Sequence, residues 1–405
     1  MFEYVTKLKG LIIDADSFEK NYRDWNILVK EYECCFLTVS ESIADELSGL
    51  YGQETVLLLE KFEKIFSPNY STHKKVLDHL GVLTTEVVYI SRDNSFITNA
   101  LGFVSGTILV KETSVRYHEA SQHPDLICAS IKEVEAVLKK SIRGSFGEVV
   151  ISPNIENKRG FVRPIEFECD GEVVQLFSLG RYFGYSHYMN QLHPYSSAIY
   201  LNKQEKRKAY GLFDSQFSNL YAKIVSRIKE HVDVECVCHV PVRPGKKNRF
   251  KTIVEYIAET TSTDNISESF VCVENYEAQK GFSREGRAEN IKNVFRYNGE
   301  LNEKTVILID DVISTGATIQ ECIRVLKNAG AKEVIVIVLA INQLGGTYWS
   351  SNQPIIECPM CGEKMHLLLN SKNKKFFYSC YGCSKTMEYT LGREQLIEKI
   401  NGEFR

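Results

Sequence analysis

The feature that most constrains the fold of this chain is the segment 306–318, in which a short apolar run ends in two adjacent acids. The run has the composition of a buried parallel strand, and Asp310 and Asp311 follow it directly. A Ser-Thr-Gly turn comes next, then a segment that begins at Thr318 and has apolar residues at helical spacing, and Gly330 supplies a C-terminal stop. Helix N-termini bind anions through free backbone N–H groups, and open α/β sheets bind ligands at the carboxyl ends of their strands. The segment therefore predicts a phosphate on the turn and a hydroxyl-bearing sugar at the acids.

This segment closely resembles the motif with which type I phosphoribosyltransferases bind PRPP, a ribose that carries a 5′-phosphate and a 1-pyrophosphate. The resemblance implies that Asp310 and Asp311 contact the ribose hydroxyls and that the turn holds the 5′-phosphate. The residues of the turn are Ser314, Thr315, Gly316, Ala317 and Thr318. The alternative is an ordinary strand–turn–helix unit with acids there by chance, although acids, turn and helix all fall at the required offsets.

A basic loop follows the strand-like segment 234–242. Pro and Gly give this loop a tight backbone path, and four of the seven residues 243–249 are cations. Cations at this density suit a diphosphate, and type I phosphoribosyltransferases have a pyrophosphate loop in this place. We therefore expect Arg243, Lys246 and Lys247 to bind PRPP, and a solvated basic turn is the alternative.

Residues 279–295 resemble the Gln…Arg-x-x-Asn…Phe stretch of the ComF-type branch of the phosphoribosyltransferases. In the wider family the matching loop is mobile and closes over PRPP, which excludes water from the reaction. The polar candidates are Gln279, Arg287 and Asn290, and a surface loop is the alternative. The aromatic, His-bearing region 181–196 could recognise a base by stacking, but a Tyr-rich edge of the core is the preferred interpretation.

The first third of the chain alternates strands with helices, which predicts a parallel sheet. The order of these elements resembles the haloacid dehalogenase-like (HAD) phosphohydrolases across about residues 8–142. The resemblance implies that Asp14 is the nucleophile and Asp16 the acid/base, and that both hold Mg²⁺ together with Asp93. Ser17-Phe18 departs from the family pattern, which usually has Gly or Asn and then Thr.

Two further positions of the HAD resemblance would bind the phosphoryl group. They are Thr38, with Ser40 as an alternative, and Lys75, with Lys74 as an alternative. Arg92 stands where the family usually has an acid, and a cation beside the metal position weakens Mg²⁺ binding. A degenerate structural domain is therefore the alternative to an active phosphatase.

Near the C-terminus the cysteines follow the pattern C-x₂-C-x₁₈-C-x₂-C, formed by Cys358, Cys361, Cys380 and Cys383. Two such pairs can supply four thiolates to a tetrahedral Zn²⁺, and the pattern resembles a zinc ribbon. Four protein ligands leave no open position, so we expect a structural metal; a redox pair or disulfides are the alternative. The other eight cysteines lie in or beside apolar segments, which is typical of free buried thiols.

The same tail combines cations with aromatic residues. Between residues 364 and 385 there are five lysines and no acid. The lysines are Lys364, Lys372, Lys374, Lys375 and Lys385, and the interleaved aromatic residues are Phe376, Phe377, Tyr378 and Tyr381. Cations with exposed aromatic rings suit single-stranded nucleic acid, whereas aromatic residues that pack the small ribbon are the alternative.

Composition agrees with an ordinary soluble protein: 43% of the residues are hydrophobic and 25% charged, and the net charge of −3 implies no general attraction to nucleic acid. The longest apolar run, 334–341, is too short to span a bilayer, so we expect a cytoplasmic protein without membrane contact. The expected fold class is α/β, with two parallel-sheet domains and a small zinc ribbon. The expected domains are a HAD-like Rossmannoid domain at 1–142, a phosphoribosyltransferase domain at 146–348, and the ribbon with a C-terminal helix at 354–405.

The predicted function is an enzyme that transfers the phosphoribosyl group of PRPP to an unidentified small-molecule acceptor and releases pyrophosphate, with Mg²⁺ at the active site and structural Zn²⁺. The HAD-like domain would act as a coupled phosphatase on a nucleotide-like compound. The alternative is a PRPP- or nucleotide-sensing protein, related to ComF-type DNA uptake, that binds nucleic acid or partners through its ribbon. In a third interpretation the HAD-like unit alone is active and the PRPP site is regulatory. Self-association is compatible with all three.

Overall fold

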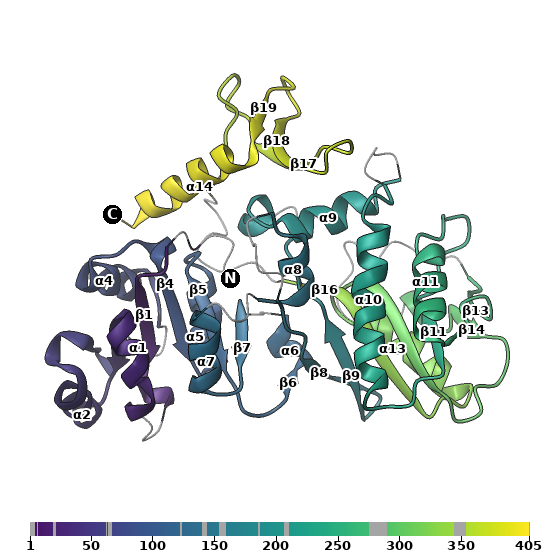
Figure 1. Ribbon diagram of the computed structural model, residues 1–405, viewed down its shortest axis with the longest axis horizontal. Coiled ribbons are helices and arrows are strands. Elements are labelled where there is room, and N and C mark those ends of the chain that lie inside the picture. The colour runs from purple at the N-terminus through teal and green to yellow at the C-terminus, as the bar shows by residue number, and fades with distance from the viewer. Residues whose placement is uncertain are drawn as a thin grey trace.

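The computed structural model describes the chain apart from residues 1–4, 6, 19–21, 62, 64–66, 122–123, 140–143, 154–158, 185–186, 206–209, 275–289, 344–353 and 405. Two α/β units lie side by side, and a small C-terminal unit lies across both of them (Figure 1). No helix within the described ranges has the length and apolar composition needed to cross a membrane.

The first unit is a six-stranded parallel sheet in the order β3-β2-β1-β4-β5-β7. Its strands are β1 (Gly10–Asp14), β2 (Glu33–Thr38), β3 (Val56–Leu58), β4 (Val87–Ser91), β5 (Gly106–Val110) and β7 (Leu126–Cys128). Its helices are α1 (Asn26–Glu31), α2 (Glu41–Tyr51), α4 (Tyr70–Leu80), α5 (Asn94–Leu101) and α7 (Ile131–Leu138). The expected parallel sheet is confirmed. Because the strand order reverses beside β1, the carboxyl ends of β1 and β4 are the switch point at which sheets of this kind bind ligands.

The second unit is an eight-stranded sheet in the order β12-β11-β15-β16-β9-β8-β6, with β10 paired to β16. All of its pairs are parallel except β8 with β9. Its strands are β6 (Val115–Arg116), β8 (Pro164–Cys169), β9 (Glu172–Ser178), β10 (Arg181–Tyr182), β11 (Cys236–His239), β12 (Asp264–Asn265), β15 (Thr305–Ile313) and β16 (Glu333–Asn342). Around it lie α6 (Tyr117–Ala120), α8 (Phe146–Ile151), α9 (Pro194–Asn202), α10 (Asp214–Lys229), α11 (Lys251–Thr261), α13 (Ala317–Asn328) and the hairpin β13 (Phe270–Cys272) with β14 (Phe295–Tyr297).

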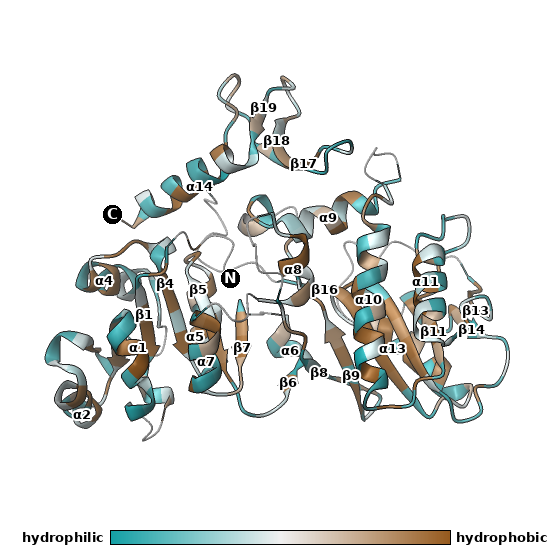
Figure 2. Cartoon of the chain, in the orientation of Figure 1, coloured by the Kyte–Doolittle hydropathy of each residue, from teal (hydrophilic) through white to brown (hydrophobic). Residues whose placement is uncertain are grey.

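The apolar run before the two acids forms the centre of this second sheet. Ile307 and Ile309 pack into one hydrophobic cluster and Val306 and Leu308 into another, so both faces of β15 are buried. The hydropathy colouring shows the strands at the centre of this sheet, around the label β16, as mostly apolar (Figure 2). A strand that is buried on both faces has a continuous run of apolar residues, which is why the sequence predicted a strand here.

The C-terminal unit is a three-stranded antiparallel sheet followed by a helix: β17 (Met365–Leu369), β18 (Phe376–Cys380), β19 (Thr386–Glu388) and α14 (Tyr389–Glu403). The sheet rests on the second unit, where the Tyr378 hydroxyl donates to the Gln191 carbonyl oxygen at 2.7 Å. The helix reaches the first unit, where Asn401 Oδ1 accepts from the Thr85 hydroxyl at 3.0 Å and Phe404 packs against His73. This tail therefore bridges the two α/β units, as Figure 1 shows.

The two α/β units also contact each other directly. Arg181 is 3% exposed and binds Asp125 of the first unit at 2.6 Å and Glu148 at 2.8 Å. A buried arginine with two carboxylate partners resists separation of the two units, because removing one partner would leave an uncompensated buried charge. Strand β6 leaves the first third of the chain and pairs with β8 of the second sheet. The domain boundaries expected at 142–146 and 348–354 stay a prediction.

Candidate functional site

The two acids of the opening segment lie inside β15 rather than at its end, because the strand continues to Ile313. The register pairs Asp310 with Val338 and Val312 with Ala340 of β16. Each acid also accepts the next backbone N–H: Asp310 Oδ1 from Asp311 N and Asp311 Oδ1 from Val312 N, both at 2.8 Å. These local bonds fix both carboxylates on the backbone of the central strand, three and two residues before its carboxyl end.

Two cations hold Asp311. The Arg249 guanidinium lies 2.8 Å and the Lys203 ammonium 3.4 Å from Asp311 Oδ2. Burial acts to raise the pKa of Asp311, but Lys203 and Arg249 together hold it below its usual value. Burial and the Asp311 carboxylate raise the pKa of Asp310 to about 7. Of the two adjacent acids, Asp311 is therefore the one that ionises more readily, because the cations contact its carboxylate and the pKa of Asp310 is raised.

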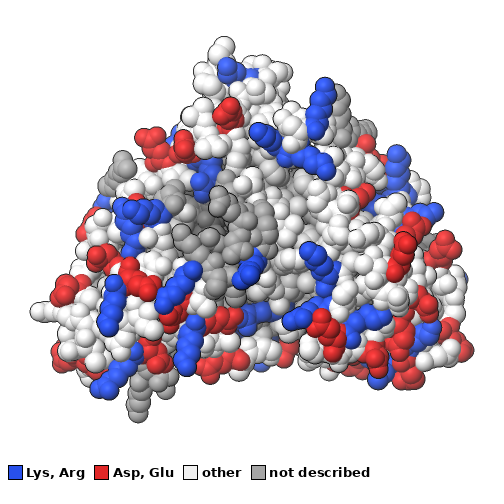
Figure 3. Space-filling model, in the orientation of Figure 1, with Lys and Arg blue, Asp and Glu red and all other residues white. Residues whose placement is uncertain are grey.

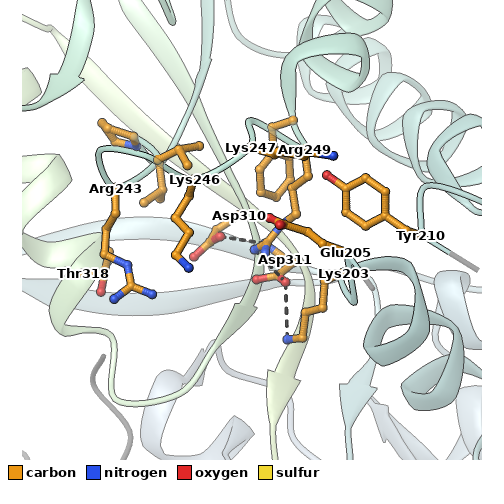
Figure 4. Close-up of a pocket in the computed structure, with 14 residues that line it drawn as sticks. Lys203, Glu205, Tyr210, Arg243, Lys246, Lys247, Arg249, Asp310, Asp311 and Thr318 are labelled. Carbon is orange, nitrogen blue, oxygen red and sulfur yellow. Dashed lines mark hydrogen bonds and ion pairs between the residues drawn. The ribbon is translucent and has the colours of Figure 1, made fainter. Parts of the chain in front are cut away.

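A cavity of about 300 Å³ opens over these acids. In Figure 4 Arg243 and Lys246 lie toward Thr318, whereas Lys203, Glu205 and Tyr210 lie on the other side of the acids. The lining residues are Lys203, Glu205, Tyr210, Val240, Pro241, Val242, Arg243, Lys246, Lys247, Arg249, Phe250, Asp310, Asp311 and Thr318. The cavity thus combines carboxylates, which suit sugar hydroxyls or a hard metal ion, with clustered cations, which suit phosphate groups.

The turn 314–316 leads from β15 into α13, which begins at Ala317, one residue before the expected start. Gly316 is required here for two reasons. Its φ of +84° is rarely adopted by other residues, and a Cβ would lie 2.7 Å from the Phe167 ring. The N-terminus of this long helix is the element to which the sequence assigned the phosphate, and Thr318 of its first turn lines the cavity.

The basic loop is held in place by His239, the last residue of β11. The His239 Nδ1–H donates to the Val240 carbonyl oxygen at 2.8 Å, and Asn248 Nδ2 donates to His239 Nε2 at 3.0 Å. This tautomer follows from the hydrogen bonds, since a neutral ring both donates and accepts. Burial lowers the pKa of His239, which keeps the ring neutral. The loop that carries Arg243 and Arg249 therefore begins and ends on a fixed support.

The first sheet gathers a second set of acids at the carboxyl ends of β1 and β4. Asp14 is 1% exposed and its Oδ2 accepts from the Ser91 hydroxyl at 2.7 Å. Asp16 accepts from the Thr38 hydroxyl and from Val39 N, the latter at 3.2 Å. The structure thus brings together Asp14, Asp16 and Thr38, which the sequence associated only through a family resemblance. Their roles stay a prediction.

The other residues of that resemblance have different partners. Asp93 is the N-cap of α5, where its Oδ1 accepts from Ser95 N at 2.8 Å. Arg92 forms an ion pair with Glu112 at 2.7 Å. Lys75 is half exposed and lies 3.3 Å from Glu63, whereas Lys74 donates to the Phe404 carbonyl oxygen at 3.3 Å. Mg²⁺ binding by Asp93 and phosphate binding by Lys75 stay predictions.

The four cysteines of the tail converge. Their Sγ atoms all lie within 4.8 Å of one another, so the cluster could bind a structural metal such as zinc; it consists of Cys358, Cys361, Cys380 and Cys383. The backbone supports this arrangement, because Cys358 belongs to the turn before β17, whereas Cys380 ends β18. Of the other eight cysteines, Cys272 is partly exposed and the rest are buried, as the sequence predicted.

Three of the five lysines of the ribbon lie apart from its exposed aromatic ring, Tyr381. Lys372, Lys374 and Lys375 lie in the β17–β18 turn, whereas Tyr381 lies beyond the other end of β18. Tyr381 is 51% exposed and stacks on His366 with ring centroids 4.0 Å apart. Phe376, Phe377 and Tyr378 are buried or partly buried. The structure therefore separates residues that are interleaved in the sequence, and it favours packing for three of the four rings.

The aromatic region 181–196 is mostly core, which was the preferred interpretation. The Tyr195 hydroxyl donates to the Leu339 carbonyl oxygen at 2.8 Å, and His193 is 1% exposed. Gln279 and Arg287 lie outside the described residues; Asn290 is described and partly buried. Sequence reasoning missed Lys203 as a partner of Asp311, because it lies just beyond α9 with no motif around it.

Comparison with known proteins finds similarity to part of the second unit. Residues 258–354 match the family model described as the phosphoribosyl transferase domain. Competence protein F of Haemophilus influenzae is 30% identical over 96 residues, which are 23% of this chain and 42% of that protein. Ribose-phosphate pyrophosphokinase of Corynebacterium glutamicum is 28% identical over 131 residues, 31% of this chain and 35% of that protein.

Two further similarities concern shorter or weaker matches. Transcriptional regulator GfcR of Methanosphaera stadtmanae is 40% identical over 68 residues, 16% of this chain and 33% of that protein. A purine phosphoribosyltransferase structure from Pyrococcus horikoshii aligns with 36% of this chain and 93% of its own, at 20% identity and a TM-score of 0.23. The matches span less than half the length of each of the three curated relatives. The family match therefore covers β15, α13 and β16 of the second unit, together with the residues around them, and extends over residues 258–354.

Proposed function

We propose that this chain binds PRPP in the cavity of the second unit and transfers the phosphoribosyl group to an acceptor. The observation that carries the proposal is the juxtaposition of Asp310 and Asp311 with the cations of one loop in one cavity. Both acids lie within the residues that match the phosphoribosyl transferase domain, and the loop precedes those residues. The acids would bind the ribose hydroxyls, and the N-terminus of α13 would bind the 5′-phosphate. Arg243, Lys246 and Lys247 would bind the pyrophosphate.

In the transfer step a lone pair of the acceptor forms a bond to the anomeric carbon of the ribose. The bond between that carbon and the pyrophosphate oxygen breaks, and its electron pair leaves with pyrophosphate; the acceptor then loses a proton. Positive charge develops on the sugar, so the ionised Asp311 is suitably placed to stabilise it, and the loop cations stabilise the leaving group. The oxygen ligands of Asp310 and Asp311 fit Mg²⁺, which when bound would neutralise pyrophosphate charge.

The arrangement of charges implies a rearrangement on binding. Arg249 and Lys203 hold Asp311 now, and ribose hydroxyls or Mg²⁺ would compete with them for the same carboxylate. Both cations line the cavity, so once displaced they can turn to the phosphate groups. The cost of breaking the two ion pairs is offset by the stronger bidentate pairing of arginine with phosphate.

The test is pyrophosphate release from PRPP in the presence of a metabolite extract, with calorimetry of PRPP binding beside it. Asp311→Asn should abolish both signals. Asp264→Asn is the matched control, because Asp264 is an exposed acid of the same sheet whose partner is Lys304. Binding and turnover that persist in Asp311→Asn would reject this site.

We infer for the first unit a phosphatase reaction coupled to the transfer, with Asp14 as the nucleophile. The support is the pair Asp14 and Asp16 at the switch point of a parallel sheet, with hydroxyl donors around them. The test is phosphate release from the transferase product. Asp14→Asn should stop it, whereas Asp24→Asn, an exposed acid of the same unit, should not. Equal rates in the two variants would refute the coupling.

The second candidate is a PRPP-responsive protein that binds nucleic acid. Two of the relatives are named a competence protein and a transcriptional regulator, and three exposed lysines lie together in the β17–β18 turn: Lys372, Lys374 and Lys375. If this candidate holds, single-stranded DNA binds with a strong salt dependence that the triple lysine-to-glutamine variant removes. The separation of these lysines from Tyr381 makes it the weaker proposal.

A further inference from the structure

One segment of the first unit ends at the phosphate turn of the second. Residues 111–121, here named the crossing segment, connect β5 with β7, which are neighbours in the first sheet. Two neighbouring parallel strands need only one crossover connection, yet this one leaves its own sheet. It enters the second sheet as β6, forms the short helix α6, and then returns (Figure 1).

Tyr117 of the crossing segment contacts the turn in two ways. Its hydroxyl donates a hydrogen bond to the carbonyl oxygen of Ser314. Its ring packs edge-on against Phe167, with centroids 5.1 Å apart and planes at 82°. Phe167 is 2% exposed and is the ring that would collide with any side chain at Gly316. Tyr117 thus restrains the turn directly at its start and through Phe167 at its end.

The bond to Ser314 fixes more than one oxygen. In a trans peptide the C=O and the following N–H point in opposite directions, because the unit is planar. Holding the Ser314 carbonyl on Tyr117 therefore orients the N–H of Thr315 away from Tyr117. That N–H belongs to the turn that would bind the 5′-phosphate, where donors fixed before the ligand arrives cost less to order on binding.

The crossing segment is itself anchored, so Tyr117 has a fixed position. Val115 and Arg116 pair with Ile165 and Glu166 of β8. The Gln343 side-chain amide donates to the Ala120 carbonyl oxygen at 3.4 Å. Within the segment, Lys111 and Glu119 form an ion pair at 2.6 Å. A side chain held by such contacts loses little further entropy when it positions a neighbour.

We propose that Tyr117 is a positioning residue for the 5′-phosphate turn, so that the first unit completes the PRPP site of the second. The identity of the ligand, PRPP, rests on the proposed function, whereas the contact of Tyr117 with the turn does not. The other end of the segment reaches the switch point of the first sheet, because Glu112 pairs with Arg92, and the backbone N–H of Arg92 donates to the Ser17 hydroxyl at 3.1 Å. One short segment therefore contacts both candidate sites.

The test is Tyr117→Phe in the full chain, which keeps the ring and removes the hydroxyl. Loss of one hydrogen bond of about 1 kcal/mol should weaken PRPP binding about fivefold, with KM affected more than kcat. Tyr117→Leu also removes the contact with Phe167 and should weaken binding further. Tyr32→Phe is the matched control, because the Tyr32 hydroxyl donates to the Leu138 carbonyl oxygen at 3.4 Å within the first unit.

Hydrogen–deuterium exchange of residues 312–320 supplies a readout that does not depend on PRPP. Faster exchange there in Tyr117→Phe, but not in Tyr32→Phe, is the expected result. If the wild type binds no PRPP yet this exchange difference is seen, the proposed function fails and the positioning role stands. If the wild type binds PRPP and Tyr117→Phe matches it in both affinity and exchange, the positioning role is overturned.

Discussion

Each of the two sheets has a pair of acids near the carboxyl ends of its central strands, here called the first edge and the second edge, and the two pairs have different surroundings. At the first edge, the contacts of Asp14 and Asp16 include the hydroxyls of Ser91 and Thr38. At the second edge, Asp311 contacts two cations, Arg249 and Lys203. Hydroxyl donors orient a carboxylate and leave its charge in place, whereas cations neutralise it. The second edge is therefore suited to exchange its own cations for a charged ligand, whereas the hydroxyls of Thr38 and Ser91 orient the carboxylates of the first edge.

The charges on one face of the molecule provide a comparison for this difference. Lys and Arg are interspersed with Asp and Glu over the face shown in Figure 3. The local cations at the second edge come instead from one loop and from the residue after α9. The contrast between the edges is a property of the sites, and single substitutions can test it.

The largest effect is expected where one change loosens the support of both edges. Cys380→Ser should prevent metal binding by the ribbon, and with it the seating of α14, whose Asn401 accepts from Thr85 of the first unit. We expect loss of the bound metal and a drop in unfolding free energy on the order of 3 kcal/mol. Metal analysis and thermal unfolding measure both. Cys272→Ser, a partly exposed thiol outside the cluster, is the control. A full metal content in Cys380→Ser would show that this cluster is not the metal site.

The next effect is confined to the second edge. Gly316→Ala meets both a φ of +84° and the Phe167 ring at 2.7 Å, whereas Gly171→Ala meets a φ of +82° with open space around it. We expect unfolding free energies to fall by about 3 and about 1 kcal/mol, respectively, because only the first adds overpacking to backbone strain. PRPP binding should be lost in Gly316→Ala alone. Chemical denaturation measures the stability of both variants, and calorimetry measures their PRPP binding. Equal losses of stability would mean that the Phe167 ring moves aside for the added methyl group.

A more local, pH-dependent effect separates the two acids of the second edge. The pKa of Asp310 is raised from 3.8 to about 7, first by burial and then by the Asp311 charge. The folded state thus keeps a proton that the unfolded state loses, and its stability falls as pH rises through this window. Asp310→Asn should equal the wild type in stability below pH 4 and exceed it by on the order of 4 kcal/mol above pH 7.

Binding should show the opposite trend in pH. If the ribose or Mg²⁺ requires ionised Asp310, PRPP affinity of the wild type rises between pH 6 and 8, and Asp310→Asn abolishes that rise. Denaturation and calorimetry across this range measure both trends. Asp264→Asn, at an exposed position of the same sheet, should follow the wild type throughout. A stability difference that is independent of pH would contradict the raised pKa.

The sequence predicted those features of the fold and site that are formed by contiguous residues. The run before Asp310, the turn and the helix are contiguous, so periodicity and offsets identified them, with an error of one residue at the start of α13. Lys203 and Tyr117 reach the same site from distant parts of the chain. The strand that leads to Tyr117 has two residues, too few for any pattern. Long-range contacts of single side chains leave no periodic signal, and resemblance to a family supplies only the residues in its motifs.

The smallest expected effect concerns Lys75, which a motif predicted for the phosphate of the first edge but whose ammonium lies 3.3 Å from Glu63 with the side chain 49% exposed. Such a pair contributes little, so Lys75→Met should change unfolding free energy by less than about 0.5 kcal/mol. Because α4 directs Lys75 toward Glu63, we also expect phosphate release to change less than twofold, whereas Asp14→Asn abolishes it. A large loss of turnover in Lys75→Met, with stability unchanged, would mean that Lys75 leaves Glu63 when substrate binds. In that case the first edge also gains a cation with its ligand, and the contrast with the second edge holds only in the absence of substrate.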